Sequence, residues 1–395
     1  MRNSFVILAV LLAAVVGNAW GQVQYTVTDL GTVSGGTSSN ATAINNNGQV
    51  VGYANLTSGA QLAFLYSNGV MQDLGTLSGG TGSQATGINN SGQVVGYSSL
   101  SSGAYRAFLF NNGVMKDVGT VSGGSSSGAT AINDSGQIVG GWEGGGFLYS
   151  GGTMQNLGEF SPIGINNSGQ VVGQMWGSDA HAFLYSNGAF QDLGSLMGSD
   201  SSDIYTSIAN GINGSGQVVG YGNLQSGHGH FLTYGAFLYS DGTMQYLGPP
   251  VGPLVETFAN GINNSGQVVG FEYLPAGNHA LLWDGDGPAV DLNNLIDPNS
   301  GWTLWSATGI NNSGQICGNG INPNGQYDAF LLTPTPEPST LALLATGSIG
   351  LLGYAWRRRK RSLSLFDQDE PTSQDDGPAI LSFPSRWTEA KRRAA

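Results

Sequence analysis

The stretch Gly87-Ile-Asn-Asn-Ser-Gly-Gln-Val-Val-Gly96 recurs with small changes along most of the chain and decides its fold. Successive copies lie 33 to 50 residues apart. A self-similar period of this size is typical of solenoids and β-propellers. The isoleucine of the phrase marks its seven copies: Ile44, Ile88, Ile132, Ile165, Ile212, Ile262 and Ile310. We therefore expect seven equivalent structural repeats.

Each repeat contains two predicted β-hairpins. In the first, Asn-Ser-Gly separates two short apolar strands, and its glycine suits the left-handed position of a three-residue loop. The second phrase, Ala63-Phe-Leu-Tyr-Ser-Asn-Gly-Val-Met-Gln-Asp-Leu-Gly75, places Asn-Gly between two further strands. No segment between residues 22 and 332 has the 3.6-residue apolar period of a helix. Four strands in about 45 residues form one propeller blade.

The two ends of the repeat array complement each other. The segment Tyr25–Thr32 matches the closing phrase Met71–Thr76, whereas the last repeat stops at Leu332 without such a phrase. The N-terminal segment can therefore supply the fourth strand that the last repeat lacks. A closed ring needs this strand, because otherwise one sheet would have an exposed edge. The sequence thus predicts an all-β, seven-bladed β-propeller over residues 22–332, closed by the N-terminal strand.

The composition narrows the possible functions. The chain has 395 residues, 65 of them glycine, and only 9% are charged, against about 25% in an average protein. Hydrophobic residues make up 40%, enough to pack a core. Between residues 22 and 335, two cations (Arg106 and Lys116) face 18 carboxylates, which excludes nucleic acid as a partner. A single cysteine, Cys317, excludes an internal disulfide framework and is expected to be buried.

The N-terminus has the layout of a secretory signal. Arg2 precedes the unbroken apolar run Phe5–Val16, and the small residues Gly17 and Ala19 suit the positions before a signal-peptidase cut. Residues 1–21 are therefore predicted to be a signal peptide.

Near the C-terminus, Ser339–Trp356 is a stretch of 18 residues without a charge, and five consecutive cations follow it. A bilayer-spanning helix needs about 17–25 such residues, and a basic flank faces the cytoplasm. We predict a Pro-rich linker at 333–338 and a transmembrane helix with a basic stop at 339–361.

This C-terminal region resembles the PEP-CTERM sorting signal of Gram-negative bacteria. The resemblance is carried by a proline motif, the apolar span and an arginine cluster, with the motif residues Pro336, Glu337, Pro338, Arg357, Arg358 and Arg359. It implies recognition and cleavage by an exosortase-type enzyme and delivery to the cell surface or extracellular matrix. Family members end just after the basic cluster, whereas a charged tail of expected disorder, 362–395, follows here. A retained membrane anchor therefore stays open as an alternative.

The repeats resemble the bacterial extracellular HAF repeats over roughly residues 25–332. His181-Ala182-Phe183 matches the naming triplet literally, and His279-Ala280-Leu281 matches it loosely. The resemblance implies export and a repeat scaffold, and it implies no defined reaction.

Candidate ligand-binding residues lie on one face of the expected ring. The connections after Val-Val-Gly and after Asp-Leu-Gly vary in length and share a face, and binding sites favour variable loops on a rigid scaffold. Aromatic residues near these connections could stack on sugar rings or could instead close the blade tops as core. They are Trp142, Trp176, Tyr221, Phe271, Trp302 and Trp305.

No catalytic, cofactor-binding or metal-binding residues are predicted. The four histidines are scattered, and His228-Gly-His230 alone has a metal-like spacing, whereas zinc needs three or four ligands. The aspartate of Asp-Leu-Gly recurs in most blades, so we expect it to cap turn amides.

We therefore predict an exported, surface-attached or matrix-associated, non-catalytic repeat protein that is sorted by an exosortase-type system. It serves either in binding or adhesion, to extracellular polysaccharide or a surface protein, or as a structural scaffold. The alternative is a propeller enzyme that acts on polysaccharide, with Asp200, Asp203 and Glu256 as candidate carboxylates. A glycosidase needs two carboxylates about 5–10 Å apart. Paired buried carboxylates in the central channel would favour the enzyme, and a channel lined by Gly and Val would favour the scaffold.

Overall fold

The computed structural model describes residues 24–177, 180–196, 206–225, 232–249, 255–285, 287–335, 350–351 and 353–357. The chain divides into two compact units, residues 1–336 and 337–395. The predicted signal peptide, the PEP residues, the tail and most of the predicted membrane helix lie outside the described residues. In the second unit, 350–351 and 353–357 are helical, and no helix within the described ranges is long and apolar enough to cross a bilayer.

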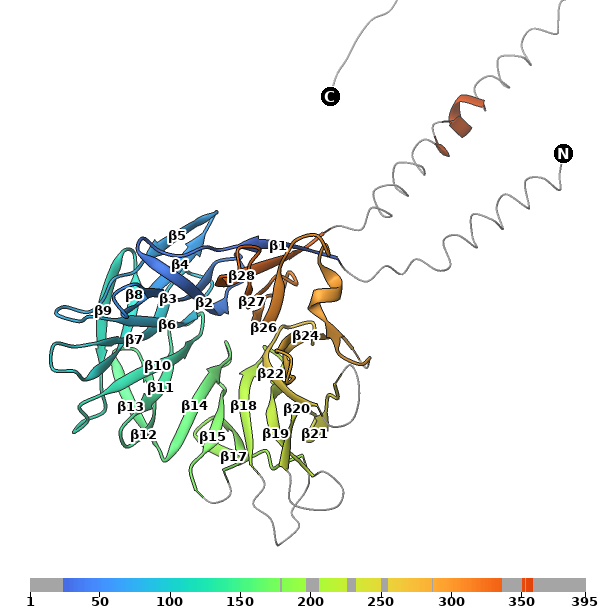
Figure 1. Ribbon diagram of the computed structural model, residues 1–395. Helices are drawn as coiled ribbons and strands as arrows, with labels where there is room; N and C mark the ends of the chain where they lie inside the picture. Colours follow the sequence, from blue (N-terminus) through green and yellow to red (C-terminus); the bar gives the residue numbers. More distant parts are fainter. Residues whose placement is uncertain are drawn as a thin grey trace, which may run out of the picture. The chain divides into compact units, whose positions relative to one another are not determined.

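The first unit is a seven-bladed β-propeller, as the repeats predict, and each blade is a four-stranded antiparallel sheet (Figure 1). Blades 1 to 3 are β2 (Gly36–Ile44) to β5 (Val70–Asp73), β6 (Ser83–Ile88) to β9 (Val114–Gly119), and β10 (Ser127–Ile132) to β13 (Thr153–Gly158). Their middle strands are β3 (Val50–Leu56), β4 (Gln61–Ser67), β7 (Val94–Ser99), β8 (Tyr105–Asn111), β11 (Ile138–Trp142) and β12 (Gly145–Ser150).

Blades 4 to 6 repeat this order with β14 (Phe160–Ile165) to β17 (Ala189–Asp192), β18 (Ser207–Ile212) to β21 (Thr243–Tyr246), and β22 (Glu256–Ile262) to β25 (Val290–Asp291). Their middle strands are β15 (Val171–Met175), β16 (Ala182–Ser186), β19 (Val218–Gln225), β20 (Leu232–Ser240), β23 (Val268–Tyr273) and β24 (His279–Trp283). A 3-10 turn, η1 (Leu292–Leu295), follows β25.

Blade 7 is shared between the two ends of the repeat array, which confirms the predicted closure. It contains β26 (Thr303–Ile310), β27 (Ile316–Ile321) and β28 (Tyr327–Pro334), and the N-terminal β1 (Tyr25–Asp29) pairs antiparallel with β28. The register runs from Tyr25 opposite Pro334 to Asp29 opposite Phe330, and Thr335 N donates to Gln24 O at 2.8 Å. In Figure 1, β1 lies beside β28 although about 300 residues separate them.

The core lies between neighbouring blades. The phenylalanine of the second phrase is fully buried, as Phe64 and Phe108 illustrate. One cluster joins Val51 and Ala63 of blade 1 to Val94 and Phe108 of blade 2. One such cluster lies at each of the seven blade boundaries, so every blade packs against both of its neighbours.

A bulge in each inner strand explains the glycine of Val-Val-Gly. In blade 2 the register shifts between Ala85 and Gly87, directly after the pair that Ala85 forms with Gly96. A Cβ on Gly96 would lie 1.9 Å from the Gln84 carbonyl oxygen. The same clash, at 1.8–2.1 Å, occurs at all seven equivalent positions: Gly52, Gly96, Gly140, Gly173, Gly220, Gly270 and Gly318.

Candidate functional site

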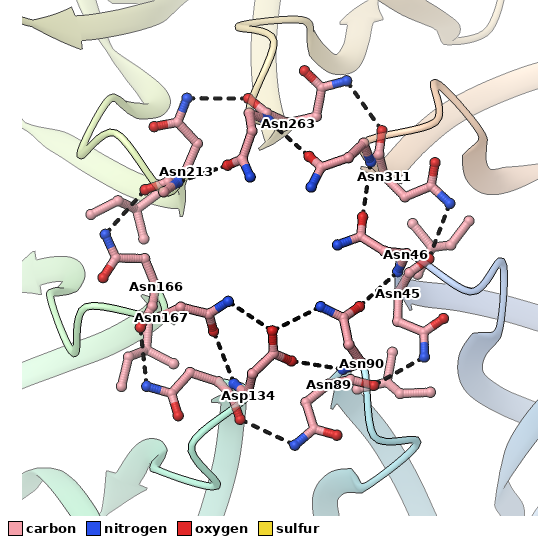
Figure 2. A pocket seen from close by; sticks show the side chains of 18 of the residues that line it. Asn45, Asn46, Asn89, Asn90, Asp134, Asn166, Asn167, Asn213, Asn263 and Asn311 are labelled. Atoms are coloured by element: carbon pink, nitrogen blue, oxygen red, sulfur yellow. Dashed lines mark hydrogen bonds between the residues drawn. The ribbon is translucent and has the colours of Figure 1, made fainter. Parts of the chain in front are cut away.

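A ring of asparagines surrounds one mouth of the central channel (Figure 2). Each is the first asparagine of an Ile-Asn phrase and follows an inner strand. The Nδ2 of Asn89 donates to Asn133 O at 3.1 Å, and its Oδ1 accepts from Ser91 N and Gln93 N. The pattern repeats through every blade and closes where Asn311 Nδ2 donates to Asn45 O at 3.0 Å. These side chains therefore cap the hairpin turn and connect each blade to the next.

The residues that directly follow these asparagines in the sequence form a second, more exposed ring. One member of this second ring is charged. Blade 3 has Asp134 at this position, whereas five other blades have an asparagine: Asn46, Asn90, Asn167, Asn264 and Asn312. Burial raises the pKa of Asp134, but hydrogen bonds from Asn90 N, Asn90 Nδ2 and Asn167 Nδ2 outweigh this and leave the pKa below its usual range. Blade 5 has Gly214, so this ring is interrupted there.

The channel mouth gives no support to hydrolysis. Its cavity of about 240 Å³ is lined by isoleucines and asparagines with Asp134 as the single carboxylate. This lining matches neither the paired carboxylates expected of an enzyme nor the Gly and Val expected of a scaffold. Of the candidate carboxylates, Asp200 and Asp203 lie outside the described residues. Glu256 begins β22 and forms no ion pair with another described residue.

The opposite, variable face carries a groove over blades 2 to 4. Two of the six predicted aromatics, Trp142 and Trp176, line it together with Tyr97 and Tyr105, and its volume is about 470 Å³. Trp142 ends β11, and Trp176 follows β15, where its Nε1 donates to Ser161 Oγ at 2.5 Å. The position of Trp176 after Val-Val-Gly thus places a half-exposed indole at the groove.

The groove continues past Tyr97 and Tyr105 into a polar compartment of about 670 Å³. The two tyrosine rings border both compartments and pack edge to face, with centroids 5.6 Å apart. Serines, threonines, glycines and the amides of Gln61 and Gln84 line the polar compartment, and none of its lining residues is charged. Sequence reasoning missed these residues, although Tyr97 directly follows a Val-Val-Gly.

The other four predicted aromatics lie in packing clusters away from this groove. Tyr221 packs at 4.8 Å from Phe258, which stacks on Phe271 at the same centroid distance. Two tryptophans of blade 7 also pack on neighbouring rings: Trp302 on Phe330 at 6.0 Å and Trp305 on Tyr327 at 5.7 Å. Trp302 belongs to the core cluster around β26.

The aspartate of Asp-Leu-Gly caps a turn, as expected from its recurrence. Asp73 Oδ1 accepts from Gly75 N at 2.8 Å, and Asp117 and Asp192 accept in the same way. In two blades the residue before Ala-Phe is basic, and its side chain contacts the aspartate of Asp-Leu-Gly in the same blade. Arg106 is 3.9 Å from Asp117, and His181 is 3.1 Å from Asp192. In these two blades the residue before Ala-Phe therefore contacts the aspartate of the outer strand, Arg106 as a salt bridge and His181 as a hydrogen bond.

Blade 6 holds the densest titratable cluster. His279 Nδ1 lies 3.0 Å from Asp291 Oδ2 and 3.6 Å from Glu272 Oε1. Burial raises the pKa of Glu272, His279 opposes this rise, and Asp291 adds to it. No group of three or more metal-ligating side chains forms a metal site within the described residues. Cys317 is buried, and burial raises the pKa of its thiol to about 12.

Comparison with known proteins supports the sorting motif and the fold. Residues 334–360 match the family model of the PEP-CTERM protein-sorting motif. This motif marks an exported protein that is sorted by an exosortase-type enzyme. A sequence search against curated proteins gives no match.

Solved structures with a similar fold share little sequence with the chain. A puromycin-hydrolysing peptidase from Mycobacterium tuberculosis has 10% identity and a TM-score of 0.50, covering 78% of this chain and 54% of its own. The β-propeller domain of the Trilobed protease from Pyrococcus furiosus has 10% identity and a TM-score of 0.49, covering 75% and 94%. YCF48 bound to a D1 peptide has 11% identity and a TM-score of 0.48, covering 81% and 98%. At this identity the peptidase shows the fold alone.

Proposed function

We propose that the chain is a surface-attached or matrix-associated, non-catalytic repeat protein whose rigid ring presents the variable face as a binding surface. The sorting motif supports this proposal because it starts where the ring closes. The last pair of the closing strands joins Tyr25 to Pro334, and the matched motif begins at residue 334. The matched motif therefore follows the propeller directly in the sequence.

The remaining features of export belong to the same proposal. Residues 1–21 act as a signal peptide, and 339–361 span the inner membrane until an exosortase-type enzyme acts on the motif. We also assign the repeats to the HAF type, on the strength of the literal triplet His181-Ala182-Phe183.

Replacing Pro336, Glu337 and Pro338 together by alanine is expected to shift most of the protein from the cell surface and medium to the membrane fraction. The physical reason is that the ring still folds, while the enzyme loses the motif it recognises. Immunoblots of fractionated cells measure this shift. Lys116→Ala, which removes an exposed cation from the ring, serves as the matched control. An unchanged distribution of the triple variant would refute sorting through this motif.

The cluster of blade 6 favours one alternative, an enzyme that acts on polysaccharide. Glu272 and Asp291 share His279, and the raised pKa of Glu272 suits a general acid. Asp291 Oδ1, however, accepts from Asn293 N at 2.8 Å and caps η1, which is a structural role. The enzyme hypothesis predicts that the full chain releases reducing ends from polysaccharide and that Glu272→Gln abolishes this release while Glu256→Gln does not.

A further inference from the structure

The groove on the variable face has a chemical character that identifies its ligand class. Tyr97 and Tyr105 line both of its compartments, so a ligand that lies across these two side chains would reach both. Their volumes lie within the roughly 300–1,000 Å³ of small-molecule sites. One side offers aromatic surfaces, and the other offers hydroxyls and amides. A ligand that fits must therefore combine apolar ring faces with many hydroxyl groups, which is the chemistry of a carbohydrate chain.

Hydrogen bonds orient the polar groups of the groove in advance. The Tyr97 hydroxyl donates to Gln84 Oε1, Gln84 Nε2 donates to Gln61 Oε1, and Gln61 Nε2 donates to Asn55 Oδ1 at 2.9 Å. Such a chain fixes the amide orientations across blades 1 and 2, so less conformational entropy is lost on binding. The aromatic groups remain accessible, because Tyr105 and Trp176 are 51% and 47% exposed.

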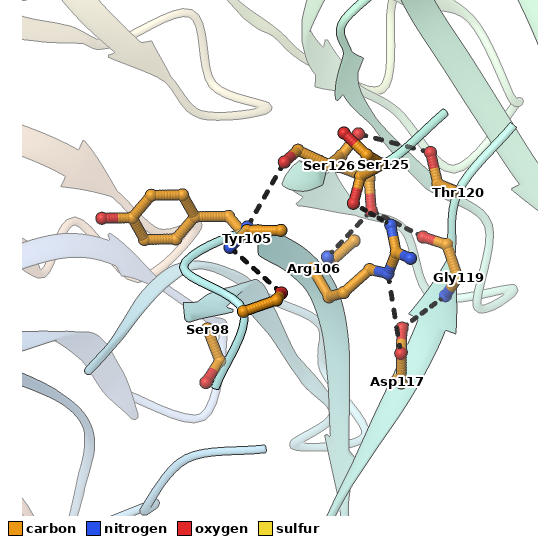
Figure 3. A network of polar contacts seen from close by, with 12 residues as sticks. Ser98, Tyr105, Arg106, Asp117, Gly119, Thr120, Ser125 and Ser126 are labelled. Atoms are coloured by element: carbon orange, nitrogen blue, oxygen red, sulfur yellow. Dashed lines mark hydrogen bonds and ion pairs between the residues drawn. The ribbon is translucent and has the colours of Figure 1, made fainter. Parts of the chain in front are cut away.

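The charges around the groove exclude anionic ligands. Glu143 lines the aromatic compartment, and hydrogen bonds from the Ser125 hydroxyl and from the backbone of Ser125 and Ser126 lower its pKa, so it stays ionised. The nearest cation, Arg106, is next to Tyr105 in β8, and its side chain points to the opposite side of the strand (Figure 3). There it donates to Ser125 O and pairs with Asp117. A ligand carboxylate would therefore meet Glu143 in the groove, whereas the Arg106 guanidinium is already engaged by Ser125 O and Asp117.

We propose that this groove binds an extended polysaccharide chain without acidic groups, with its sugar rings against Tyr105 and Trp176 and its hydroxyls toward the polar compartment. The assignment rests on the proposed role of the variable face as a binding surface. An amine-bearing sugar gains an additional attraction to Glu143, whereas a uronic acid polymer is repelled by it.

The test measures binding of cellohexaose, a glucosamine hexamer and hexagalacturonate to the full chain in detergent, followed by tryptophan fluorescence. The neutral and amine-bearing hexamers should bind at least about tenfold more tightly than hexagalacturonate, a difference of about 1.4 kcal/mol. Trp176→Ala and Tyr105→Ala should each weaken binding about tenfold. Tyr273→Ala is the matched control, because Tyr273 is 56% exposed at the end of β23 in blade 6 and does not line the groove. Glu143→Gln should lower the affinity for the glucosamine hexamer and raise it for hexagalacturonate.

Equal binding of hexagalacturonate and cellohexaose would overturn the ligand class. Binding that is insensitive to Trp176→Ala and Tyr105→Ala would overturn the groove, whatever the effect of Tyr273→Ala. If no hexamer binds while the full chain still binds the matrix of its own cells, the inference fails and the proposed function stands. If neither binding is observed, both fail.

Discussion

Deletion of Tyr25–Thr32 is expected to lower the melting temperature of the ring by about 6–9 °C and to broaden the transition. The deleted segment contains β1 and the buried side chains of Tyr25 and Leu30. Burying two such side chains and their strand hydrogen bonds is worth about 4–6 kcal/mol. Without β1, β28 becomes an exposed edge strand. The covalent connection that runs from the sheet of blade 7 through β1 into blade 1 is also lost.

Cys317 reports directly on this opening. It is the only cysteine of the chain, and it packs with Ala41, Val50 and Phe64 of blade 1 although it belongs to blade 7. In the intact ring the buried thiol should react slowly with a maleimide, and in the deletion variant it should react rapidly.

The control keeps the backbone of the closing strand and changes an exposed side chain. Thr26→Ala should leave both the melting temperature and the thiol reactivity unchanged, because Thr26 points to solvent in β1. A synthetic peptide with the sequence of residues 24–32 should partly restore protection of the thiol in the deletion variant. Unchanged melting and a protected thiol after deletion would show that the ring does not need this strand.

The repeat phrase was sufficient to predict the blades, because its turns and strands are local features. The Asn-Gly hairpins appear where they were expected, with Asn68 and Gly69 both at positive φ. The closing strand could also be predicted, since Tyr25–Thr32 carries the same Asp-Leu-Gly that ends other blades. Local chemistry and the count of repeats thus define the architecture.

The groove could not be predicted in the same way, because it depends on which side chains of three blades converge. Trp142 and Trp302 are both partly buried against a core cluster, yet only Trp142 also lines the groove. Tyr105 precedes the Ala-Phe motif, where no aromatic role was expected. The asparagine ring could be predicted in part, because an asparagine follows the isoleucine in all seven copies of the phrase. A role in the turn is enough to explain this recurrence, so nothing in the sequence indicated the hydrogen bond between blades, such as that from Asn89 to Asn133 O.

Alanine in place of the glycine opposite the inner-strand bulge is expected to destabilise the ring strongly. Blade 3 offers the best test of this second prediction. There two adjacent glycines, Gly140 and Gly141, lie in the same strand, β11. A Cβ on Gly140 would lie 2.1 Å from Gly128 O and 2.8 Å from Phe147 Cζ, whereas a Cβ on Gly141 would meet no atom closer than Gly145 O at 3.8 Å. Contacts below 3 Å with backbone require the bulge itself to move.

Gly140→Ala should therefore destabilise the ring by about 3 kcal/mol or more, which for a body of this size lowers the melting temperature by about 5 °C. Gly141→Ala should stay within about 0.5 kcal/mol of the parent, because the methyl group enters open space on a compatible backbone. Thermal unfolding followed by circular dichroism compares the two variants directly. Both variants add the same methyl group to the same strand, so the effect of alanine on β-strand propensity is the same in both. The difference between their melting temperatures therefore measures the contact of the methyl group with the bulge. Equal melting temperatures would mean that the bulge relaxes freely, and the glycine of Val-Val-Gly would then need another explanation in all seven blades.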